Sequence, residues 1–254
     1  MYFPEKISCI DHFGGQNEVY IIIIWCLWLV LLSFEGHADE DVKANITSGL
    51  QSLLPDMKIT AITPSPVQNI YQVMMGPDIV YMTGDGRYLL KGDLLDLQDR
   101  RNLSEEGRSV ARLDILKNIS ERDLIEFAPE KTEHAIYVFT DVDCSYCQRL
   151  HRDVPELNKN GVAVRYLAFP RAGIDSKAYR DMVAVWCAGD RHQALTDAKN
   201  GKPVAYRQCD NPVKQQYQIG RSLGIRGTPA IFLENGTELP GYMSPDKLVN
   251  LIRG

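Results

Sequence analysis

The feature that most constrains the fold is an apolar run that ends in an acidic turn and a pair of cysteines. Residues 135–140 read Ala-Ile-Tyr-Val-Phe-Thr, and Cys144 and Cys147 follow with two residues between them. The apolar run is typical of a strand, and the cysteines open a predicted helix. A thiol in the first turn of a helix faces unpaired backbone N–H groups and the positive end of the helix dipole, which stabilise a thiolate. The pattern therefore predicts a nucleophile at Cys144 and a resolving thiol at Cys147.

A zinc site, covalent haem attachment and a structural disulfide are alternative interpretations of the cysteine pair. A zinc site needs two more ligands at short spacing, but Cys187 and Cys209 lie far downstream and far from each other. Covalent haem attachment needs a histidine directly after the second cysteine, where this chain has Gln148. A structural disulfide across two residues is uncommon, because so small a loop constrains the unfolded chain little. Redox chemistry is favoured, and the zinc and structural interpretations stay open.

The N-terminal segment resembles a signal for export. Residues 20–34 carry no charge, and this run is shorter than the roughly 20 residues of a membrane span. Small residues before position 39 predict cleavage after Ala38, which makes residues 1–38 a leader. However, the residues before the apolar run include one basic side chain, Lys6, against three acidic ones, which is the wrong balance for a secretory signal. An uncleaved anchor therefore stays open.

Removal of the leader would leave four of the six cysteines. An even number in an exported protein is typical of two disulfides. If Cys144 pairs with Cys147, the other pair is Cys187 with Cys209, which we interpret as a structural staple. The formal net charge of −5 gives no reason to expect nucleic-acid binding.

The N-terminal part of the chain predicts a small α+β unit. Residues 39–54 have the apolar spacing of a helix, and residues 58–97 read as short strands separated by proline and glycine turns. A unit of this size has a thin core and an exposed sheet edge, so it often dimerises. Residues 102–119 are charged on most faces and predict a solvated connecting helix, where the domain boundary falls.

The C-terminal part predicts a mixed sheet flanked by helices. It begins with a strand, a helix and a strand, continues with a helical insertion, and ends with two strands and a helix. The predicted elements are strands over 134–140 and 162–169, helices over 145–160, 175–188, 190–199 and 212–223, strands over 227–233 and near 238–241, and a helix from Ser244.

Five further residues carry expectations of their own. His151 is expected to be a surface histidine, although it could tune the thiol. Asp143 is expected to cap the helix, and Asp141 either caps it or raises the thiol pKa. Trp186 and Tyr179 are expected in the core.

Four segments of the chain carry a resemblance to a known family. The chain resembles the DsbC/DsbG family of periplasmic thiol:disulfide interchange proteins, which have a thioredoxin fold, from about Asp39 to the C-terminus. The segments are VFTDVDCSYCQRLH, VRYLAFPRAGIDS, VWCAGD and LGIRGTPAIFLENGTELPGY.

The resemblance implies the architecture of an α+β chain. It implies a C-terminal thioredoxin-like domain with a helical insertion over 121–254, which carries the catalytic site. It further implies a linker helix over 101–120 and a small cystatin-like dimerisation domain over 39–100.

The resemblance also assigns roles to residues. Gly227-Thr228-Pro229 corresponds to the family's cis-proline loop, whereas that tripeptide alone would predict an ordinary trans-proline strand start. Tyr146, Thr228 and Pro229 are expected to bind substrate, and Cys187–Cys209 is expected to be the family's structural disulfide. Ser145 departs from the glycine or proline usual at its position, which leaves the reduction potential open.

The combined hypothesis is an exported, periplasmic and homodimeric disulfide isomerase or reductase. It would act on misoxidised or unfolded exported proteins, with no metal and no cofactor beyond its own cysteines. By resemblance, a membrane reductase of the DsbD type would keep it reduced. The alternatives are a thiol oxidase of the DsbA type and a chaperone-like binding module. The small N-terminal domain argues against the oxidase, because dimerisation could shield the active site from the oxidising machinery.

Overall fold

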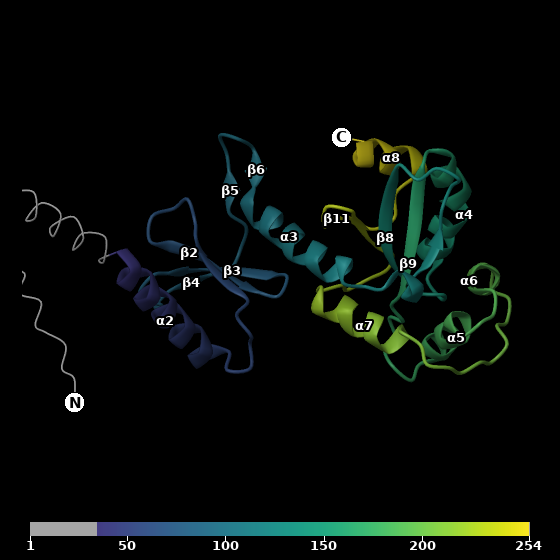
Figure 1. Cartoon of the computed structure of the whole chain (residues 1–254), viewed down its shortest axis with the longest axis horizontal. Helices are drawn as coiled ribbons and strands as arrows, with labels where there is room; N and C mark the ends of the chain where they lie inside the picture. The colour runs from purple at the N-terminus through teal and green to yellow at the C-terminus, as the bar shows by residue number, and fades with distance from the viewer. Residues whose placement is uncertain (1–34, 254) are drawn as a thin grey trace, which may run out of the picture.

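The computed structural model describes residues 35–253, which form two lobes joined by a long helix (Figure 1). The expected leader falls almost entirely on residues 1–34, which lie outside the described residues, and its cleavage site stays a prediction. Within residues 35–253, no helix is both long and apolar enough to cross a membrane.

The N-terminal lobe packs one helix, α2 (Glu35–Leu53), on an antiparallel sheet of order β1-β2-β3-β4. Its core is small: Ile46 and Leu50 of the helix meet side chains of the sheet, and the cluster is separate from the cores of the other lobe. The expected helix is present, and the sheet is formed by short strands within the expected segment 58–97. The strands are β1 (Ala61–Pro64), β2 (Ile70–Met75), β3 (Asp78–Thr83) and β4 (Leu89–Leu90).

The connecting helix α3 (Leu103–Lys117) follows a short hairpin that was not predicted, formed by β5 (Leu95–Asp96) and β6 (Arg101–Asn102). The side chain of Asn102 accepts a hydrogen bond from the backbone N–H of Glu105 and caps the helix. The expectation of a solvated helix is wrong in part, because Ser104, Arg112 and Leu116 are buried. The reason is that the start of α3 packs on β3 and its end joins the core of the C-terminal lobe.

The C-terminal lobe is built on a five-stranded mixed sheet of order β11-β10-β8-β9-β7. The central strands β8 and β9 are parallel, and the other pairs are antiparallel. The bounds are β7 (Ile125–Phe127), β8 (His134–Thr140), β9 (Val162–Ala168), β10 (Ala230–Leu233) and β11 (Glu238–Leu239), and a 3-10 turn, η1 (Glu121–Asp123), precedes β7.

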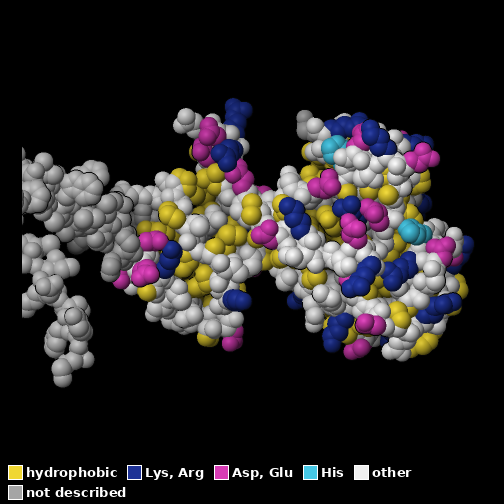
Figure 2. Space-filling model, in the orientation of Figure 1, with side chains coloured by type: hydrophobic (Ala, Val, Ile, Leu, Met, Phe, Trp, Pro, Cys, Tyr) yellow, Lys and Arg dark blue, Asp and Glu magenta, His cyan; other side chains and the backbone are white. Residues whose placement is uncertain are grey.

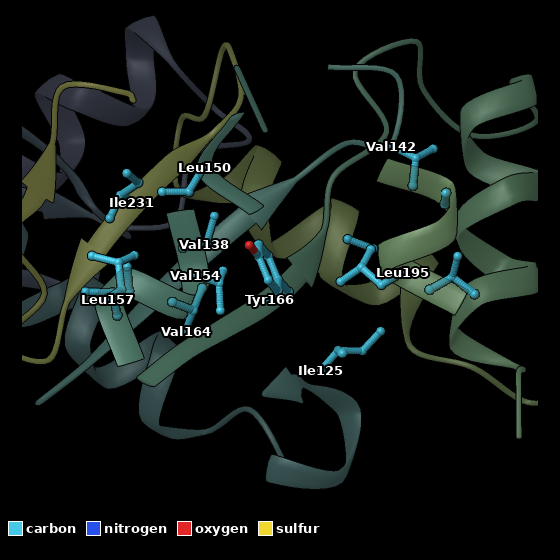
Figure 3. Packing of buried hydrophobic residues seen from close by; sticks show 14 of the residues in the cluster. Ile125, Val138, Val142, Leu150, Val154, Leu157, Val164, Tyr166, Leu195 and Ile231 are labelled. Carbon is cyan, nitrogen blue, oxygen red and sulfur yellow. The ribbon is translucent and has the colours of Figure 1, made fainter. Parts of the chain in front are cut away.

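Alternation along β8 sends its side chains to two cores on the two faces of this sheet. Ile136 and Val138 pack with α4 on one face, where Figure 3 shows Val138 beside Val154 and Val164. Phe139 lies in a second cluster, with residues of α3 and the segment after α7. The helices are α4 (Ser145–Lys159), α5 (Lys177–Trp186), α6 (Arg191–Lys199), α7 (Val213–Ser222) and α8 (Pro245–Arg253). The expected α+β architecture is confirmed.

Candidate active site

The two cysteines lie where β8 passes into α4. Cys144 is the N-cap residue of the helix, and its Sγ accepts a hydrogen bond of 3.3 Å from the backbone N–H of Cys147. The Cys144 thiol also donates to the carbonyl oxygen of Thr228, 3.1 Å away. Both cysteines are free thiols and both are buried. The strand and the helix therefore hold a dithiol against the loop that precedes β10.

The two thiols differ in acidity. The hydrogen bond with the side chain of Cys147 lowers the pKa of the Cys144 thiol to about 5, and the backbone N–H of Cys147 and the charge of the nearby Arg171 act in the same direction. Burial raises the pKa of Cys147 above that of a free thiol, and its hydrogen bond with Cys144 adds to this effect. At neutral pH, Cys144 is thus a thiolate and Cys147 keeps its proton.

The loop opposite the dithiol contains Thr228 and Pro229, joined by a cis peptide bond. The structure thereby brings together Cys144, Cys147 and this loop from segments far apart in the sequence. Tyr146 is 58 % exposed, and its ring stacks on that of Tyr242, with the centroids 6.1 Å apart. An exposed aromatic surface thus lies beside the buried thiols.

The acidic turn before Cys144 has a different role from the expected one. Cys144 caps α4, so the expectation that Asp143 is the cap is wrong. Asp141 is buried instead, and its carboxylate accepts hydrogen bonds from the backbone N–H of Asp143 at 2.8 Å and from Arg171 at 2.9 and 3.1 Å. Arg171 also donates to the carbonyl of Asp143. Arg171 follows β9 and holds the turn in place through these bonds, a role that the sequence did not predict.

His151 is not the surface residue that was expected. It is 8 % exposed, because α4 presents it to the sheet, and its ring nitrogens lie 3.1 Å from Tyr166 Oη and 3.0 Å from Thr196 Oγ1. Burial, together with a smaller effect of the charge of Lys199, lowers the pKa of His151 to about 4. Trp186 is fully buried and Tyr179 packs against the core, as expected.

The second cysteine pair lies in the helical insertion. Cys187 at the end of α5 and Cys209 ahead of α7 form a disulfide. The segment between the two cysteines includes α6. In the part of the chain that the structure describes, no group of His, Cys, Asp and Glu side chains is arranged to hold a metal ion.

Each of the two lobes matches the model of a known domain family. Residues 121–253 match the model of a thioredoxin-like domain, and residues 36–105 match the N-terminal domain of a disulfide bond isomerase protein. A dithiol at the start of the first helix of a thioredoxin-like domain defines a thiol–disulfide exchange protein.

Comparison with individual proteins narrows this class. The chain is 36 % identical over 224 residues to the thiol:disulfide interchange protein DsbC of Escherichia coli (strain K12), covering 87 % of this chain and 92 % of that protein. The DsbC of Salmonella typhimurium is 35 % identical over 226 residues, covering 89 % of this chain and 92 % of that protein. The chain therefore belongs to the DsbC family of thiol:disulfide interchange proteins. A disulfide interchange protein from Neisseria gonorrhoeae matches in structure with a TM-score of 0.49 and 31 % identity, over 53 % of this chain and 96 % of that one.

Proposed function

We propose that the chain isomerises incorrect disulfides through Cys144 and Cys147, with Cys144 as the attacking thiol. The observation that carries this proposal is the difference between the two thiols: the pKa of Cys144 is lowered to about 5, while burial raises that of Cys147. A thiolate is the nucleophile in thiol–disulfide exchange, and a thiol of low pKa is also a good leaving group. The pair can therefore form a mixed disulfide and release it again.

The reaction has two outcomes after the first attack. The Cys144 thiolate attacks one sulfur of a substrate disulfide, a Cys144–substrate bond forms, and the other substrate sulfur leaves as a thiolate. If a substrate thiolate then displaces Cys144, the substrate disulfide is rearranged and the enzyme stays reduced. If Cys147 displaces the substrate sulfur, the substrate is reduced and the enzyme becomes oxidised at Cys144–Cys147.

The groups next to Cys144 form the proposed substrate site. The exposed ring of Tyr146 offers an apolar surface for an unfolded chain. Thr228 and Pro229 precede strand β10 and lie against Cys144, so an extended substrate segment can pair with the backbone there. Cys187–Cys209 is proposed as a structural disulfide of the same domain.

A homodimer is proposed to form through the N-terminal lobe. Figure 2 shows hydrophobic side chains across much of the visible face of this lobe. Strand β4 ends the order of its sheet, and its residues Leu89 and Leu90 are 37 % and 52 % exposed. An apolar sheet edge of this kind favours pairing with a second copy. Sedimentation should report a dimer, and a monomer would count against this part of the proposal.

The cellular setting of the enzyme follows from the family and from the leader-like segment. We propose that it acts in the periplasm on misoxidised or unfolded exported proteins. There it needs a membrane reductase of the DsbD type, because an isomerase must stay reduced in an oxidising compartment.

Trapping of the mixed disulfide tests the proposed function. In a Cys147→Ala variant, Cys144 should stay bound to substrate, giving adducts on a non-reducing gel that disappear on reduction. The matched Cys144→Ala variant keeps the thiol of Cys147 and should give no adducts. Adducts of equal strength in both variants would contradict the assignment of Cys144 as the nucleophile.

A further inference from the structure

A buried lysine lies beneath the segment that carries the dithiol. Lys199, the last residue of α6, is 2 % exposed. Its Nζ donates to the side-chain oxygen of Thr140 at 2.5 Å and to the carbonyl oxygen of Asp141 at 2.8 Å. These acceptors are the last residue of β8 and the first residue of the turn that leads to Cys144. A buried cationic group is thus hydrogen-bonded to the end of β8 and to the turn that leads to Cys144.

Lys199 has no carboxylate partner within 4 Å among residues 35–253. The nearest acidic residue in the turn, Asp141, directs its carboxylate elsewhere, to Arg171 and to the backbone N–H of Asp143. A buried ammonium group without an anion is costly, and proteins normally pair such a group or neutralise it. The thiols of Cys144 and Cys147 can supply the missing negative charge when they lose their protons.

The titrations of the lysine and the thiols are linked. The pKa of Lys199 is lowered to about 8, mainly by burial. The charges of Cys147, Cys144 and Asp141 raise this pKa and so oppose the effect of burial, whereas the charge of Arg171 lowers it further toward that value. In return, the charge of Lys199 opposes the burial that raises the pKa of Cys147. Two further titratable neighbours stay neutral. Burial and the charge of Lys199 keep His151 on α4 unprotonated, and burial raises the pKa of Tyr166 on β9, as does the charge of Cys147.

We propose that Lys199 is the buried counter-charge of the dithiol, a positioning residue whose ammonium group stabilises the thiolates of Cys147 and Cys144. This inference rests on the proposed function of the two cysteines. In the mixed disulfide, Cys147 releases its proton to water, and its thiolate attacks Cys144 Sγ. The Cys144–Cys147 bond forms, the Cys144–substrate bond breaks, and the substrate sulfur leaves as a thiolate. Because the enzyme disulfide carries no charge, Lys199 stabilises the reduced enzyme over the oxidised one.

The redox equilibrium with glutathione tests the role of Lys199. A Lys199→Met variant keeps a long side chain but removes the charge, and the matched Lys202→Met variant removes a charge from an exposed neighbour in the same segment. We expect Lys199→Met to shift the equilibrium constant about tenfold toward the enzyme disulfide, which is about 30 mV for a two-electron couple. Lys202→Met should match the wild type. A folded Lys199→Met variant with the wild-type constant would overturn the inference.

A second measurement needs no variant. The side-chain resonances of Lys199 can be titrated by NMR in the reduced and in the oxidised wild-type enzyme. Because coupling between two sites is reciprocal, the pKa of Lys199 should be about one unit higher in the reduced enzyme. Equal values in the two states would overturn the inference. If the wild type forms no Cys144–Cys147 disulfide with glutathione, the proposed function fails as well, whereas an unchanged variant constant removes only the role of Lys199.

Discussion

Arg112 of the connecting helix α3 lies 3.1 Å from the carboxylate of Glu238 on strand β11. The guanidinium group is buried, also binds Glu105 of its own helix, and lies over the ring of Phe232. One side chain thus joins the linker to the edge of the catalytic sheet. Figure 1 shows α3 beside β11, and this ion pair links the two elements.

Replacement of Arg112 should destabilise the C-terminal lobe. Arg112→Met removes a buried guanidinium group and leaves Glu105 and Glu238 without this cation, so we expect the free energy of unfolding to fall by about 1–3 kcal/mol. Urea denaturation followed by tryptophan fluorescence measures this change. The control is Arg101→Met, which breaks the ion pair of Arg101 with Glu106, two exposed side chains. It should lower the free energy of unfolding by less than about 1 kcal/mol. Equal losses in the two variants would contradict the role given to Arg112.

Gly236 should tolerate no side chain, because the turn between β10 and β11 touches α3. It has a φ of +84°, and a Cβ there would lie 1.9 Å from the carbonyl oxygen of Ser109. Gly241 offers a matched control, with a φ of +70° and no neighbour within 4 Å. Gly241→Ala should cost about 1–2 kcal/mol from backbone strain alone. Gly236→Ala should cost clearly more in the same urea titration; a smaller loss would mean that the linker is not docked there.

The reactivity of Cys144 should depend on pH with a midpoint near 5. The hydrogen bond with Cys147 lowers the pKa of this thiol to about 5, whereas a free cysteine titrates near 8.5. Alkylation of the reduced protein by iodoacetamide, quenched at a series of pH values, should therefore already be at its plateau at neutral pH. In Cys147→Ala the midpoint should move upward, because the side-chain contact of Cys147, which is the largest stabilising one, is lost while the backbone N–H remains. A midpoint of 8 or above in the wild type would contradict this assignment.

His151 should make the protein less stable in mild acid. Its pKa is about 4 in the fold, because burial disfavours the charged ring, and 6.5 when free. As the pH falls through 6.5, the unfolded chain binds a proton that the folded chain does not, so stability is complete above 6.5 and decreases toward 4. The loss over this range is about 3 kcal/mol. Denaturant titrations should show this loss of unfolding free energy between pH 6.5 and 4 in the wild type and not in His151→Gln. An identical pH dependence of the two proteins would rule out this role of His151.

Much of the fold was predictable because its signals are local. The strand 134–140 was predicted with its observed bounds, since its apolar run is bordered by turn residues. The hairpin at Leu95–Asp96 was missed because strands of two residues have no periodicity. In the candidate site, the dithiol could be located from its spacing. His151 and Lys199 could not, because their burial depends on contacts with Tyr166, Thr196 and Thr140, which the chain places there only after folding.

The central claim is that this chain rearranges disulfides through Cys144, and recovery of activity by a scrambled ribonuclease tests it most directly. Purified reduced enzyme should restore ribonuclease activity at neutral pH, and a Cys144→Ala variant of equal stability should restore none. Failure of the wild-type enzyme, or full recovery with Cys144→Ala, would contradict the account.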